Sequence, residues 1–393
     1  MLTATKFATE FVPAWIDRAR DRDHGGVVQR LDQHGSAVEG EKKSTLAQAR
    51  TVFSLAHLYL HTGDASLLAA ARDVSGFMTT YLRSSQGGYR FAVEYDGRAS
   101  TDPADNLFRA YDQSFALLAL TTLRKADPSA VEAHMVSQLW EYIETLNEPG
   151  TGALLEDDQM ALTGPRPGDQ RAQNPQMHML EAVLQAFEMT GDRIWLERAD
   201  QYVTLAENFF IDPATGAVRE FVSHDLSALQ APEGYRREPG HQYEWAWLLL
   251  RYRELGGTKD VVQHAARMAA FADRHGVRRD GGPLDGAPYD AVDTEGRPVE
   301  TSHLLWPITE MGKLACIQHT QGLHGAGERA RKLEQLIFGR YFAPDCQTWV
   351  NQLDGSGTVL SAEALSRLIY HLLLFVTEGP RAGLWDLQPK HSQ

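Results

Sequence analysis

Hydrophobic and polar positions along the chain fall into two kinds of segment. Long stretches such as 53–82 carry apolar residues at helical spacing, and each is broken once by a short polar turn. Between them lie short glycine-rich segments in which apolar and polar residues alternate, a pattern typical of strands closed by tight turns. These extended segments are 23–35, 86–97, 151–158, 215–225, 281–292 and 347–357.

The extended segments recur at a nearly constant interval. Aligned on Gly26, Gly88, Gly152, Gly216, Gly282 and Thr348, they are separated by steps of 62, 64, 64, 66 and 66 residues. The turn inside the helical stretches also repeats, as Thr62-Gly63-Asp64, Thr190-Gly191-Asp192 and Gly256-Gly257-Thr258. Glycine suits the left-handed end of one helix, and aspartate suits the N-cap of the next. Each unit is therefore predicted to be a hairpin, a helix, a turn and a second helix.

Six such units account for almost the whole chain and predict an all-α fold. We expect an (α/α)6 barrel, with six inner helices ringed by six outer ones and short β-hairpins at one face. An open solenoid would have the same local pattern, but its repeats are usually shorter and lack a hairpin in every unit. No Pro/Ser-rich linker interrupts the period, so residues 1–393 are expected to form one catalytic domain.

Composition and charge narrow the class of protein. Apolar residues make up 43% of the chain and charged residues 23%, which is ordinary for a globular protein. The net charge is 38 − 52 = −14, which argues against nucleic acid or an anionic membrane as the main partner. No window reaches 18 consecutive apolar residues, so we expect no membrane-spanning helix.

The two cysteines and the start of the chain bear on the compartment. Cys316 and Cys346 cannot build a disulfide framework or a zinc-ribbon site. The first residues lack a basic start followed by an apolar run, so no signal peptide is predicted. A reduced, cytoplasmic setting is the expectation.

Unusual polar and aromatic residues fall early in the helix that follows each extended segment. One such residue per unit keeps the period, with steps of 61, 67, 63, 65 and 65 along the series Arg50, Tyr111, His178, His241, Trp306 and His371. Equal spacing places them at equivalent heights on successive inner helices. The sequence therefore predicts that they converge around one mouth of the barrel.

Two histidines in this series have a glutamate one helical turn later. His241 precedes Glu244, and His178 precedes Glu181, so each pair shares a helical face. Glu244 is expected to hold the tautomer of His241, with Trp245 and Trp247 as apolar surroundings. Helical carboxylate metal sites prefer the reverse order, Glu-x-x-His, and neither HExxH nor a phosphate-binding loop is present. No metal and no cofactor are predicted.

Carboxylates on the same helices keep a second enzyme class open. Glycoside hydrolases also use helical toroids and need two acids across the scissile bond. Asp112, Glu181, Glu244 and Glu310 are candidates for such a pair. The set of histidines favours proton transfer beside a carbonyl instead, because neutral imidazole can both take and return a proton near pH 7.

Four segments resemble the N-acylglucosamine 2-epimerase superfamily, which includes aldose–ketose isomerases of mannose. They are RAQNPQMHMLEAVLQAFEMTGDRIWLERA at 171–199, EPGHQYEWAWLLLR at 238–251, LLWPITEMGK at 304–313 and IYHLL at 369–373. The resemblance implies an (α/α)6 barrel and metal-free 1,2-proton chemistry on a reducing sugar. It makes His241 and His371 the acid/base pair, with Arg50 on the anionic oxygen and Glu244 orienting His241. It places Tyr111, Asn174, His178 and Trp306 around the sugar, with Glu310 binding or supporting it.

Isomerase and 2-epimerase differ in where the proton returns, and the WPITEMG and IYHLL segments are more similar to the mannose-type isomerases. Gln113 and the pair Leu304-Leu305 depart from the family pattern: histidine is common at the first position and a cation at the second. We therefore expect a neutral monosaccharide and interconversion of D-mannose and D-fructose. A sugar 2-epimerase is the alternative, followed by a glycoside hydrolase or a non-catalytic binding protein. A homodimer is the expected assembly.

Overall fold

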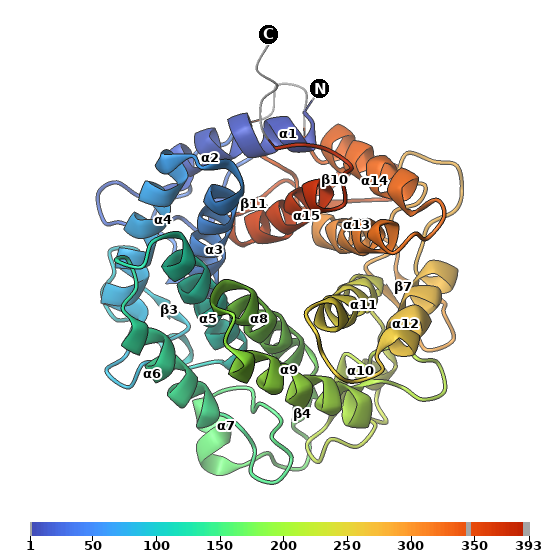
Figure 1. The fold of residues 1–393 in the computed structure, drawn as a ribbon, viewed down its shortest axis with the longest axis horizontal. Helices are drawn as coiled ribbons and strands as arrows, with labels where there is room; N and C mark the ends of the chain where they lie inside the picture. Colours follow the sequence, from blue (N-terminus) through green and yellow to red (C-terminus); the bar gives the residue numbers. More distant parts are fainter. Residues whose placement is uncertain (1, 343–346, 388–393) are drawn as a thin grey trace.

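The computed structural model describes residues 2–342 and 347–387, so Cys346 lies outside the described residues. It confirms two concentric rings of helices (Figure 1). The inner ring consists of α3 (Thr45–Thr62), α5 (Ala110–Ala126), α8 (Asn174–Thr190), α11 (Pro239–Glu254), α13 (Leu305–Thr320) and α15 (Ile369–Arg381). Each inner helix packs on the next, and α15 packs on α3 to close the ring. The hydrophobic core fills the layer between inner and outer helices.

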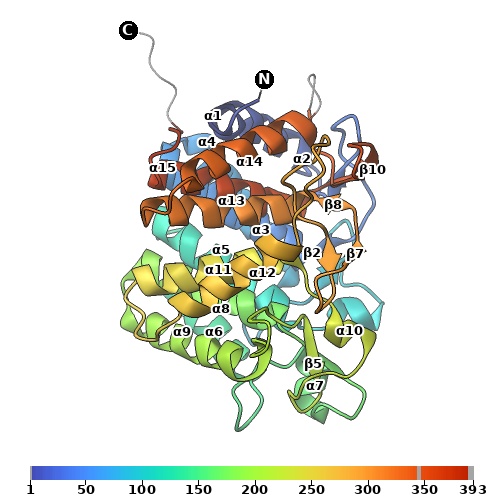
Figure 2. The ribbon, with the colours of Figure 1, turned by 90° about the vertical axis from the view of Figure 1, so that its right-hand side faces the viewer.

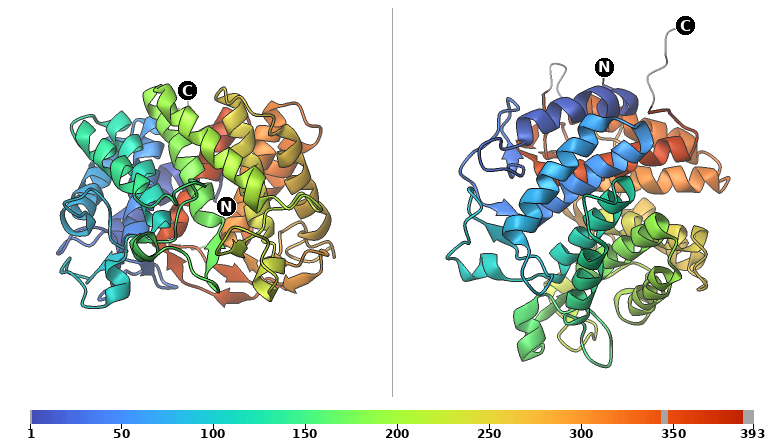
Figure 3. Two further views of the ribbon diagram at one scale, coloured as in Figure 1. Left: turned by 90° about the horizontal axis from the view of Figure 1, so that it is seen from below. Right: turned by 60° about the vertical axis from the view of Figure 1, so that its left-hand side comes forward.

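The outer ring is completed by the start of the chain, which the repeat pattern did not predict. Five outer segments follow their inner helices: α4 with η2 (Ala65–Phe77, Met78–Leu82), α6 (Ala133–Glu144), α9 with η4 (Arg193–Leu205, Ala206–Phe210), α12 (Val262–His275) and α14 (Ala326–Arg340). The sixth is α1, η1 and α2 (Ala4–Lys6, Phe7–Phe11, Val12–Ala19), which lies beside α14 (Figure 3, right). The amide N–H of Ala4 donates to Glu334 at 2.9 Å, and the Phe7 and Phe338 rings are 5.4 Å apart. As far as residue 387, where the described part of the chain ends, the last unit has no second helix of its own.

Two of the three predicted turns between inner and outer helices are confirmed, whereas at Gly256-Gly257-Thr258 α11 already ends at Glu254 and Val261 precedes α12. Gly63 ends α3 with φ 73°, and the side chain of Asp64 then accepts the N–H of Ser66 at the start of α4. Gly191 ends α8 with φ 72°, and Asp192 caps α9 in the same way. A side chain at either glycine would strain the left-handed backbone.

The extended segments form one layer at one end of the helices (Figure 2; Figure 3, left). Each unit has one antiparallel bridge between residues close in the chain: Arg20–Val27, Arg83–Tyr89, Asn147–Leu154, Ile211–Val218, Val277–Pro288 and Phe342–Trp349. The bridges confirm the period, but they begin a few residues before the extended segments that the sequence predicted.

Most of the strand ladders join different units. The strands are β1 (Arg30–Leu31), β2 (Lys43–Ser44), β3 (Ala92–Val93), β4 (Gln170–Ala172), β5 (Phe221–Ser223), β6 (Ala291–Val292), β7 (Pro298–Glu300), β8 (His303–Leu304), β9 (Gln352–Leu353), β10 (Val359–Ser361) and β11 (Ala364–Leu365). All described pairs are antiparallel, and β1–β11, β2–β3, β4–β5 and β8–β9 each connect two units. Only β6–β7 and β9–β10 are hairpins within one unit among the described residues.

A buried glutamine on four inner helices fastens the neighbouring turn. Gln48, Gln113, Gln176 and Gln242 each accept an N–H from, and donate to the C=O of, one backbone residue of the turn. For Gln113 that residue is Tyr89, at 2.7 Å for both bonds. Gln113, which departs from the family pattern, is therefore a structural residue of the repeat.

Within the described ranges, no helix combines the length and the apolar character needed to cross a lipid bilayer.

Candidate active site

A cavity of about 460 Å³ opens at the end of the barrel where the inner helices begin. Its wall contains eight of the nine residues predicted for the site: Arg50, Tyr111, Asn174, His178, His241, Glu244, Trp306 and His371. The ninth, Glu310, is fully buried behind His371. The first turns of α3, α5, α8, α11, α13 and α15 thus converge as the repeat spacing predicted.

His371 lies on one wall of the cavity, between a carboxylate and a guanidinium. Its Nδ1 is 2.7 Å from Glu310 Oε1, and its Nε2 is 3.4 Å from Arg50 Nη1. Burial lowers the pKa of His371 well below its usual value, and the charges of Arg50 and Lys313 act in the same direction. The ring is therefore neutral, with Nδ1 donating to Glu310 and the lone pair on Nε2.

Glu310 is itself held from behind by a buried lysine. Lys313 Nζ lies 2.6 Å from Glu310 Oε2, and both side chains are fully buried. Burial raises the pKa of Glu310, and the ammonium of Lys313 opposes that rise. The face of the Trp247 ring, 4.2 Å from Nζ, also stabilises the ammonium.

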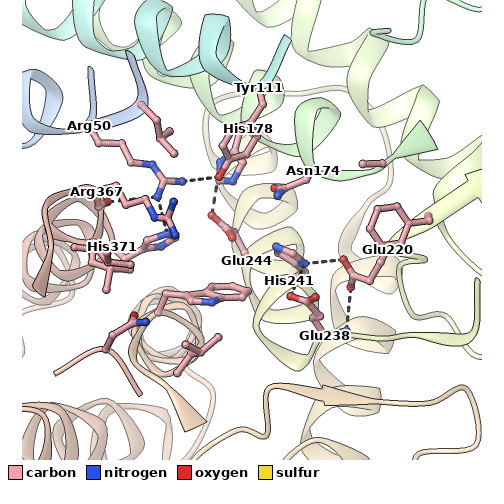
Figure 4. Close-up of a pocket in the computed structure, with 18 residues that line it drawn as sticks. Arg50, Tyr111, Asn174, His178, Glu220, Glu238, His241, Glu244, Arg367 and His371 are labelled. Atoms are coloured by element: carbon pink, nitrogen blue, oxygen red, sulfur yellow. Dashed lines mark hydrogen bonds and ion pairs between the residues drawn. The ribbon is translucent and has the colours of Figure 1, made fainter. Parts of the chain in front are cut away.

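His241 lies on the opposite wall, among carboxylates (Figure 4). Its Nδ1 is 2.7 Å from Glu220 Oε2 and 3.4 Å from Glu238 Oε2. Burial by itself lowers the pKa of His241, but Glu220 and Glu238 outweigh it and raise the pKa to about 10. His241 is thus a cation near neutral pH, whereas His371 is neutral.

The prediction that Glu244 orients His241 was wrong. Glu220, which directly precedes β5, holds the imidazole at Nδ1 from a different element. Glu244 instead approaches His178, with 3.9 Å between its Oε1 and His178 Nδ1. Neither carboxylate oxygen of Glu244 has a hydrogen-bond partner within the described part of the chain. They are available to hydroxyl groups of a ligand.

Two aromatic rings complete the wall. The Trp306 ring packs against both imidazoles, with centroids 4.8 Å from His241 and 5.7 Å from His371. Trp306, not Trp245 or Trp247, therefore supplies the apolar contact of His241, which corrects the expectation. Trp245 points away and donates to Gln173 at 2.6 Å. On the other side, Arg50 donates to the Tyr111 hydroxyl at 2.9 Å.

Comparison with known proteins agrees with this arrangement. The family model of N-acylglucosamine 2-epimerase (GlcNAc 2-epimerase) matches residues 25–374. The chain belongs to this family. Mannose-6-phosphate isomerase of Rhizobium meliloti (strain 1021) is 28% identical over 93% of both chains. D-mannose isomerase of Pseudomonas cannabina pv. alisalensis is 26% identical, over 72% of this chain and 70% of its own. A crystal structure of D-mannose isomerase has the same fold, with a TM-score of 0.83 and 19% identity over 96% and 97% of the two chains.

This GlcNAc 2-epimerase family member is an enzyme of the isomerase class, acting on a small carbohydrate. Three charged residues of its cavity were not predicted from the sequence: Glu220, Glu238 and Arg367. Glu238 is the N-cap of α11. Arg367 carries a usable signal, since it stands four residues before His371. Asn174 is the first residue of α8, and its Oδ1, which has no hydrogen-bond partner among the described residues, lies in the cavity wall.

Among the described residues, three groups of histidine and glutamate side chains have the geometry of a metal site. They are His178–Glu181–Glu244, Glu220–Glu238–His241 and Glu244–Glu310–His371, each with donor atoms within 4.8 Å of one another. Two of them already hold a cation: Lys313 is 2.6 Å from Glu310, and Glu220 and Glu238 share the imidazolium of His241. In the third, Glu181 accepts from His178 at 3.0 Å and from the hydroxyl of Tyr370. These donors fit the roles of protein partners better than those of free metal ligands.

Proposed function

We propose that the enzyme interconverts D-mannose and D-fructose by proton transfer between C2 and C1 through a cis-enediol(ate). One observation carries the proposal: the two imidazoles of the cavity differ in charge. His371 is a neutral base, and His241 is held as a cation by Glu220 and Glu238. One base that moves a proton between neighbouring carbons is what an aldose–ketose isomerase needs.

In this mechanism His371 Nε2 takes the proton from C2 of the open-chain aldose, and negative charge develops on O1, the oxygen of the former carbonyl. The proton of the C2 hydroxyl then moves to O1, C2 becomes the carbonyl carbon, and His371 returns its proton to C1. Arg50 lies 3.4 Å from the same Nε2, so its fixed positive charge is close to where O1 must be. Glu310 accepts from Nδ1 and so keeps the lone pair on Nε2, which faces Arg50.

His241 acts on oxygen rather than on carbon. As a cation His241 donates a proton to the ring oxygen of the sugar when the sugar opens. Glu220 stabilises the positive charge of His241 and fixes the position of its imidazole. Asn174 Oδ1 and the carboxylate of Glu244 accept hydrogen bonds from sugar hydroxyls, since neither has a hydrogen-bond partner among the described residues. Trp306 packs against one side of the sugar. No step uses a metal or a redox cofactor.

A sugar 2-epimerase is the second candidate, because both imidazoles contact the same Trp306 ring and could face one carbon from two sides. Epimerisation in both directions requires each imidazole to serve in turn as the base. With a pKa of about 10, His241 is almost never neutral at pH 7, which disfavours it as a base.

The test is to incubate the purified enzyme with D-mannose and identify the products by ¹³C NMR. D-Fructose as the main product supports the proposal. D-Glucose with little fructose would replace it by the epimerase. Unchanged mannose would refute the mannose reaction, and N-acetylglucosamine and cellobiose would then be tested.

A further inference from the structure

Two arginines share the wall of the cavity that holds His371. Arg50 and Arg367 both line it, and Figure 4 shows their guanidinium groups on the same side, away from Glu220 and Glu238. Arg50 is only 3% exposed. Its neighbours are the Tyr111 hydroxyl at 2.9 Å and the backbone carbonyl of Arg367 at 3.3 Å, both uncharged.

Neither guanidinium has a counter-ion in the described ranges. No ion pair within 4.0 Å involves Arg50 or Arg367. Arg30, in contrast, is paired with two carboxylates, Glu41 at 2.7 Å and Glu363 at 2.8 Å. Burial and the charge of Arg50 both lower the pKa of Arg367, and Tyr111 opposes this lowering without cancelling it.

None of the three carboxylates that line the cavity forms an ion pair with either arginine, and Glu244 approaches His178 at 3.9 Å instead. Glu220 and Glu238 lie on the opposite wall, where both contact His241, and Glu238 also pairs with Arg236 at 2.8 Å. The cavity is therefore polarised, with a cationic side and an anionic side. Two adjacent unpaired arginines are an arrangement that recognises phosphate and similar oxyanions.

We propose that Arg367 binds an anionic substituent of the substrate while Arg50 serves the oxygen at C1, and that the preferred substrate is an aldose phosphate monoester rather than a neutral sugar. The proposal rests on the isomerase function. Since isomerisation requires a free C1 and a hydroxyl at C2, the phosphate must be attached beyond C2. Leu304 and Leu305 lack a cation as noted, but Arg367 supplies one from a different element, the 3-10 turn η5 (Ser366–Leu368).

The test compares kcat/KM for D-mannose 6-phosphate and D-mannose in the wild type and in Arg367→Gln. Glutamine can still bond to a hydroxyl but carries no charge. We expect the wild type to favour the phosphate by about 10²-fold, and the preference to fall at least about tenfold in the variant, as for loss of a charge-assisted contact. Arg30→Gln is the matched control, and it should retain the wild-type preference because Arg30 does not line the cavity.

The outcomes separate this proposal from the isomerase function. Isomerisation of D-mannose with no preference for the phosphate, or a preference unchanged in Arg367→Gln, would overturn the anion site and leave the isomerase standing. If neither sugar reacts, the mannose isomerase proposal fails, and calorimetry with D-mannose 6-phosphate still decides about the anion site. Binding weakened at least about tenfold by Arg367→Gln would support it, and no binding or equal binding would overturn it.

Discussion

Glu220 Oε2 lies 2.7 Å from Nδ1 of His241, although 21 residues separate them in the chain. Glu220 directly precedes β5, which pairs with β4 from the preceding unit. It also accepts the backbone N–H of Glu238 at 2.9 Å and a bond from the Gln173 amide at 3.2 Å. The strand layer thus holds a carboxylate against the first turn of α11, and this contact sets the charge of one of the two imidazoles.

Glu220→Gln should move the alkaline limb of the pH–rate profile to lower pH. The mechanism needs His241 as a cation, so activity falls as pH rises through its pKa, which the two carboxylates raise to about 10. Removing one carboxylate leaves burial, which lowers this pKa, less strongly opposed. The measurement is kcat against pH from 6 to 11. Glu244→Gln is the comparison, and it should shift the limb less, because Glu244 does not contact His241. Equal shifts would restore Glu244 as the orienting residue.

His371→Asn should lower kcat by at least about 10²-fold, the usual scale for general acid–base catalysis. Asparagine retains polarity but cannot take the C2 proton. His61→Asn is a suitable control, because His61 is exposed in the last turn of α3, far from the first turn that bears Arg50. Retention of more than half the activity by His371→Asn would remove the mechanism.

Arg50→Lys should reduce kcat by about 10²–10³-fold with a smaller effect on KM. The proposed role of Arg50 is to stabilise charge that appears only after the C2 proton has left, and lysine is a shorter point charge that cannot also reach Tyr111 in a fork. Steady-state kinetics with D-mannose separate the two constants. A change in KM alone would mean that Arg50 only binds the sugar.

Lys313→Met should destabilise the folded protein by about 3–5 kcal/mol, because it leaves Glu310 buried without its charge partner. The double variant Lys313→Met with Glu310→Gln should recover part of that loss. Urea unfolding gives both values. Lys332→Met provides the control, since Lys332 pairs with Glu328 at 2.8 Å on an exposed helix face and should leave the urea midpoint nearly unchanged.

The sequence predicted the ring of helices because every unit has the same length. Arg50, Tyr111, His178, His241, Trp306 and His371 keep the period, and all line one cavity in the structure. Closure of the outer ring by residues 4–19 could not be predicted this way, since it joins the two ends of the chain and leaves no periodic trace.

The contacts that the sequence did not predict have a common physical origin. The pairing of His241 with Glu244 was inferred from helical spacing, whereas the actual partner, Glu220, comes from another element. Gln113 stood out only as a departure from a family pattern, and its bonds to the backbone of Tyr89 exist only in the folded repeat. Spacing along one helix identifies residues that share a face, but contacts between elements depend on how the strand layer packs against the helices.

The most direct test of the central claim is proton NMR of EDTA-treated enzyme with D-mannose in D2O. The account predicts that D-fructose appears, that it retains at C1 protium taken from C2, and that its rate of appearance is unchanged by the chelator. This result would establish proton transfer between C2 and C1 by the protein's own groups. Fructose formation that is lost on chelation and restored by a divalent cation would contradict the account, as would D-glucose deuterated at C2 in place of fructose.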